Sequence, residues 1–82
     1  MFSALRLELA AIDAAVDQVR AALRDRDAEL ALVDATDVAN VLQILTLRAA
    51  NERDAKELRA LLAERGEVNA RFAERLAVLA GH

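Results

Sequence analysis

The sequence predicts an all-α fold: a long antiparallel helical hairpin with a short third C-terminal helix, forming a coiled-coil-like homo-oligomeric bundle. Three observations support this prediction. The 82 residues include no proline and only two glycines, and Ala, Leu, Arg and Glu dominate, which is typical of long helices and coiled coils. Large apolar residues recur at spacings of three and four, as in a coiled-coil seam. Finally, a group of polar residues around Asp34 interrupts this pattern.

The first helix is predicted over about residues 4–32, because its apolar positions keep the alternating spacing throughout. These positions are Phe2, Leu5, Leu9, Ile12, Val16, Val19, Leu23, Leu30 and Val33. Arg26 occupies a seam position and is the polar member of the series. The favoured interpretation is a register-setting residue whose stem packs in the seam. The alternative is an arginine that binds a substrate or a partner in the bundle interior.

A second helix is predicted over about residues 35–65, with Asp34 as its N-cap. Val33 and Val38 occupy the positions of a hydrophobic staple around that cap. One continuous rod is the alternative, but the polar residues of this segment are poor helix-interior residues. They are Asp34, Thr36, Asp37 and Asn40. Gly66 is placed to end the second helix.

The third helix is predicted over about residues 68–80, where Val68, Phe72, Leu76 and Leu79 keep a helical spacing. Because one glycine inside a helix costs only about 1 kcal/mol, a continuous second helix through Gly66 remains an alternative. With this length, residues 1–82 are expected to form a single helical domain.

The segment Val38–Leu47 carries no charge and is apolar around most of its circumference, whereas Arg48–Glu57 is highly charged. A hairpin turning near residues 34–36 would place the first segment against residues 23–32 and the second against residues 12–20. Both pairings would leave apolar surface uncovered, which predicts burial against a second copy of the chain. The predicted interface consists of Val38, Val41, Leu42, Ile44, Leu45, Leu47, Leu9, Ile12, Val16, Val19 and Leu23.

The sequence offers no catalytic, cofactor-binding or metal-binding residues to nominate. It has no cysteine, and its one histidine, His82, stands without companions at the last position, as expected of a frayed end or a purification tag. The formal net charge of −3, with both signs interspersed, argues against a nucleic-acid partner. With no membrane partner indicated either, the expected location is cytoplasmic, and the preference for Arg over Lys suggests a bacterial gene.

The expected function is that of a small non-enzymatic protein–protein interaction or scaffolding module that self-associates, most simply as a homodimer. One alternative is a chaperone, adaptor or inhibitor that sequesters a helix of a heterologous partner protein. A second alternative is a small all-helical enzyme that binds an anionic substrate through interior arginines.

Overall fold

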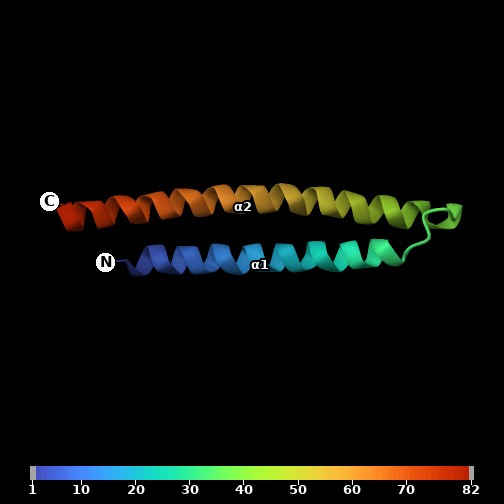
Figure 1. Ribbon diagram of the computed structural model, residues 1–82, viewed down its shortest axis with the longest axis horizontal. Coiled ribbons are helices and arrows are strands. Elements are labelled where there is room, and N and C mark those ends of the chain that lie inside the picture. Colours follow the sequence, from blue (N-terminus) through green and yellow to red (C-terminus); the bar gives the residue numbers. More distant parts are fainter. Residues whose placement is uncertain (1, 82) are drawn as a thin grey trace.

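The computed structural model describes residues 2–81, and these residues form two long helices joined by a loop. Helix α1 spans Ser3–Leu32, a 3₁₀ turn η1 spans Val38–Asn40, and helix α2 spans Val41–Gly81. The helices run antiparallel and side by side, and α2 extends past α1 at both ends (Figure 1). The expected all-α hairpin is therefore confirmed.

The hairpin is a thin rod of 66 × 15 × 14 Å. Its radius of gyration is 18.9 Å, whereas a compact domain of this length has one of about 12 Å. Because the rod is one helix pair thick, each helix can bury only one stripe of its surface within the chain.

The predicted bounds of the first helix agree with α1 to within one residue. The helix stops at Leu32 because Val33 turns to an extended conformation, with φ −84° and ψ 129°.

The predicted start of the second helix near residue 35 is wrong, since α2 begins at Val41. Asp34 accepts hydrogen bonds from the backbone N–H of Thr36 at 2.9 Å and from its hydroxyl at 2.7 Å. Asp37 accepts from the N–H of Ala39 at 2.9 Å and caps η1. These local side-chain bonds compete with helical ones, so the segment forms a loop instead of a first helical turn.

The structure has no separate third helix among the described residues, because α2 continues through Gly66 to Gly81. Gly66 has no positive φ, and a Cβ added to it would meet nothing within 4 Å. The continuous alternative therefore describes the structure. Gly66 is an ordinary helical position that lacks a side chain.

The predicted register of the hairpin is also wrong, by roughly two helical turns. The contacts that define the observed register are Phe2 with Phe72, Glu8 with Arg71, Asp13 with Arg65, and Arg26 with Asp54. The longer loop causes this shift. As a result, residues 48–57 do not lie against residues 12–20, and the start of α2 extends beyond the end of α1 (Figure 1).

The core lies in the half of the hairpin that contains the two chain ends. Its buried members are Leu5, Ile12, Val16 and Val68, against which Phe2, Leu9, Leu58, Leu61 and Phe72 pack. The rings of Phe2 and Phe72 lie 4.6 Å apart between centroids. The apolar seam of α1 thus meets the apolar seam of α2, and the mismatch expected from the sequence does not occur here.

A polar layer fills the seam nearer the loop. The guanidinium of Arg26 forms an ion pair with Asp54 and donates to the Asn51 side-chain oxygen at 3.2 Å. The Asn51 amide donates in turn to Asp27 at 3.3 Å. Asp54 is only 9% exposed, so its charge depends on Arg26 for compensation. Charged residues of α1 therefore face charged residues of α2.

Replacing Gly66 with Ala should stabilise the protein by about 1 kcal/mol, because alanine has the higher helix propensity and has open space at this position. Urea unfolding followed by circular dichroism measures the change. A destabilised variant would mean that Gly66 ends a helix in a left-handed conformation.

Asp54→Ala should lower the free energy of unfolding by about 2 kcal/mol, because it leaves the largely buried Arg26 without its counter-charge. Asp13→Ala is the matched control, since it breaks the exposed 3.1 Å pair with Arg65 and should cost less than about 0.5 kcal/mol. The free energy of unfolding is measured by chemical denaturation. An equal decrease in the two variants would contradict a special contribution of the polar layer to stability.

Candidate interaction surfaces

Large apolar side chains gather without cover at the loop end of the rod. We call Leu32, Val38, Val41, Leu42 and Leu45 the loop-end surface. Leu32 is 88%, Val38 83% and Leu42 76% exposed. The start of α2, with Val41 and Leu42, extends beyond the last turn of α1 (Figure 1), and Leu32 is the last residue of α1.

The predicted interface residues divide into two groups in the structure. In the loop half, Val38, Val41, Leu42 and Leu45 are exposed, while Ile44 and Leu47 are half-buried. On α1, Ile12, Val16 and Val19 are buried and Leu9 and Leu23 are half-buried. The α1 seam is thus largely covered by this chain's own α2, and the loop half supplies the exposed apolar surface.

The outer face of α2 is a second exposed stripe, and it points away from α1. Residues at spacings of three and four share one face of a helix. We define the outer face of α2 as Leu42, Leu45, Ala49, Glu52, Lys56, Ala60, Ala63, Glu67, Ala70, Glu74 and Val78, all of which are exposed. This stripe was not predicted from the sequence. The spacing of three and four residues would have indicated it if the alanines had been considered together with the large apolar residues.

The far end of α2 also lacks cover. Leu76 and Leu79 continue the spacing of the buried Val68 and the half-buried Phe72, but they lie beyond the start of α1 and are exposed. A hollow of about 470 Å³ beside them is lined by Glu74, Arg75, Val78 and Leu79. Both ends of the rod therefore present apolar surface, and the polar layer lies between them.

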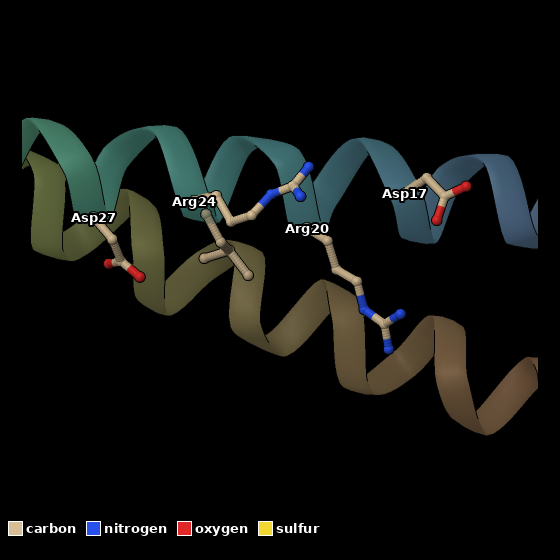
Figure 2. A pocket seen from close by; sticks show the side chains of 5 residues that line it. Asp17, Arg20, Arg24 and Asp27 are labelled. Carbon is tan, nitrogen blue, oxygen red and sulfur yellow. The ribbon is translucent and has the colours of Figure 1, made fainter.

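A polar hollow of about 520 Å³ runs along one flank of α1 (Figure 2). Its lining residues are Asp17, Arg20, Leu23, Arg24 and Asp27, all from this one helix. Two carboxylates and two guanidinium groups balance each other in charge. The seam arginine, Arg26, already binds Asp54 and Asn51. Its proposed register-setting role stays a prediction.

Within residues 2–81, no helix is long and apolar enough to cross a membrane, and no three acidic or histidine side chains form a group that could hold a metal ion. His82, interpreted from the sequence as a frayed end or a tag residue, lies outside the described residues.

The loop contains a carboxyl group, that of Asp34, whose pKa is lowered by local hydrogen bonds. The hydroxyl of Thr36, and then its backbone N–H, donate to the Asp34 carboxylate and hold the pKa of Asp34 below its ordinary value of 3.8. Asn40 supports the same turn by donating to the Asp34 carbonyl at 3.0 Å. The ionised carboxylate thus helps to fix the loop that presents Val38.

Because the folded pKa of Asp34 is lowered, its contribution to loop stability should be present above pH 3.8 and be lost as pH falls through the folded pKa. Carboxyl-carbon NMR should give a pKa for Asp34 below 3.8. Thr36→Val removes the largest cause and should raise that pKa toward 3.8, whereas an unchanged value would contradict the hydroxyl's role.

Comparison of the chain with protein-family models, with curated proteins and with solved structures found no match.

Proposed function

We propose that the protein is a small non-enzymatic helical module that self-associates through exposed apolar helix faces and serves as an interaction or scaffolding element. The observation that carries this proposal is the loop-end surface, with Leu32, Val38 and Leu42 exposed by three quarters or more. Large apolar side chains that are exposed together in one region of a monomer commonly mark protein-interaction sites.

The total exposed surface supports the same proposal. The chain exposes 6042 Å² at a mass of 8.9 kDa, whereas a compact monomer of this mass exposes about 4,800 Å². The excess of roughly 1,200 Å² exceeds the ~800 Å² that each partner buries in a standard interface. A second chain could therefore cover surface that the hairpin cannot cover for itself.

Burial of the loop-end surface would supply a substantial free energy. Full burial of one large aliphatic side chain is favourable by about 1.5–3 kcal/mol of free energy relative to exposure in water. Five such residues form this surface, and the total stability of a small domain is about 5–15 kcal/mol. Association through this surface would thus be comparable in importance to the internal core.

A heterologous helix could occupy the same surface, and a chaperone or adaptor would use it in that way. Self-association is the simpler proposal because it needs no second protein. The cytoplasmic location stays a prediction.

Leu42→Glu should dissociate the assembly, raising its dissociation constant more than 100-fold, because a symmetric contact loses two buried leucines and gains two desolvated carboxylates. Size-exclusion chromatography with light scattering measures the mass of wild type and variant at micromolar concentration. A monomeric wild-type chain would contradict self-association.

Leu7→Glu is the matched control, because Leu7 is 72% exposed, close to the 76% of Leu42, but lies on α1 away from the loop. This variant should retain the wild-type mass. Dissociation by Leu7→Glu alone would place the contact on α1 instead.

A further inference from the structure

We propose that the partner is a second copy of this chain, packed antiparallel along the outer face of α2. In this arrangement the loop end of one copy lies beside the opposite end of the other copy, where its two chain termini are. The inference rests on the proposed self-association and specifies its geometry. It follows from the dimensions of the rod and from the order of charges along α2.

The dimensions exclude an end-to-end contact as the main interface. The rod has a cross-section of 15 × 14 Å, which offers about 200 Å² per copy against the ~800 Å² of a standard interface. A side of 66 × 15 Å offers about 1,000 Å² per copy, which is sufficient. The copies should therefore pack side by side along their length.

The outer face of α2 suits a lateral contact because it begins and ends with apolar residues. Leu42 and Leu45 lie near the start of α2, and Val78 lies near its end. Between them, Ala49, Ala60 and Ala63 are small and exposed. Small residues let two helix backbones approach closely, so Leu42, Leu45 and Val78 can be buried in the same contact.

The charges on this face select the antiparallel orientation. In a parallel pair every residue would face its own copy, so Lys56 would meet Lys56 and Glu67 would meet Glu67. In an antiparallel pair that places Leu42 of one α2 helix beside Gly81 of the other, Lys56 instead faces Glu67 of the second copy. Like charges opposed across an interface are destabilising, whereas opposite charges fix its register.

The same alignment brings apolar residues of the two outer faces opposite each other. Leu45 comes opposite Val78 of the second copy, and Ala60 comes opposite Ala63 at the twofold axis. Each contact occurs twice, as a twofold interface requires. Within residues 2–81, Lys56 and Glu67 form no ion pair or hydrogen bond, so both are available to the second copy.

Charge reversal tests the contact between Lys56 and Glu67. Lys56→Glu and Glu67→Lys should each raise the dissociation constant roughly tenfold, because each introduces two like-charge contacts, and the double variant should restore wild-type affinity. Arg24→Glu, an equal charge change on α1, is the control. Sedimentation equilibrium measures all four variants. Absence of rescue, or equal weakening by Arg24→Glu, would overturn the proposed pairing.

Distance measurement tests the orientation separately. Because the chain has no cysteine, Ala35→Cys places a single nitroxide at the loop end, and Ala80→Cys places one at the other end. Pulsed electron paramagnetic resonance should give a separation near the 66 Å rod length between two Ala35→Cys copies. Mixing the two labelled chains should give a separation near the 15 Å rod thickness.

A short separation between two Ala35→Cys copies in a dimer would overturn the antiparallel geometry while leaving self-association intact. A monomer, with no intermolecular distance, would overturn both proposals.

Discussion

The constraint on which the structure depends is that two helices can bury only one stripe of each other. In a rod 15 Å thick, there is no third layer to cover an outer face. The seam between α1 and α2 consists of two parts. One is the apolar contact around Val16 and Val68, and the other is the polar layer around Arg26 and Asp54. The large apolar residues outside this seam include Leu32, Val38 and Leu42, which are exposed in the single chain.

In the observed register, the polar layer pairs Arg26 with the largely buried Asp54. A slide of one helical turn would move Asp54 away from Arg26 and leave two largely buried charges unpaired, a greater penalty than the loss of an exposed pair. The exposed pairs of Asp13 with Arg65 and Glu8 with Arg71 follow the same register. They add little energy of their own. The register-setting role predicted for Arg26 would thus bear on which apolar residues pack in the terminal half and which remain exposed near the loop.

Local signals predicted the elements better than they predicted their pairing. Seam periodicity located α1 to within one residue, because it repeats along the entire helix. The register of α2 against α1 was predicted wrongly because it depends on the length of the loop. The hydrogen bonds of Asp34 and Asp37 make this loop longer than the single N-cap residue predicted from the sequence would give. Gly66 was ambiguous for another reason: the free-energy cost of a helical glycine is small enough for tertiary packing on both sides of it to offset.

The exposed surface was predictable in part. The uncharged segment Val38–Leu47 indicated a need for cover, and its loop-end members are indeed exposed in the single chain. The reason inferred from the sequence was a mismatch between facing helices, but the structure gives a different one. The start of α2 extends beyond the end of α1 (Figure 1), and the residues of the outer face of α2 are exposed.

This difference changes the kind of partner that would complete the fold. A mismatch inside the seam would require a partner that inserts between the two helices. With an intact seam and apolar residues at both ends of the outer face, the proposed self-association would need only a partner that lies alongside. A second hairpin meets that requirement without disturbing Arg26 or the core, so assembly can add stability while the register within each chain stays fixed.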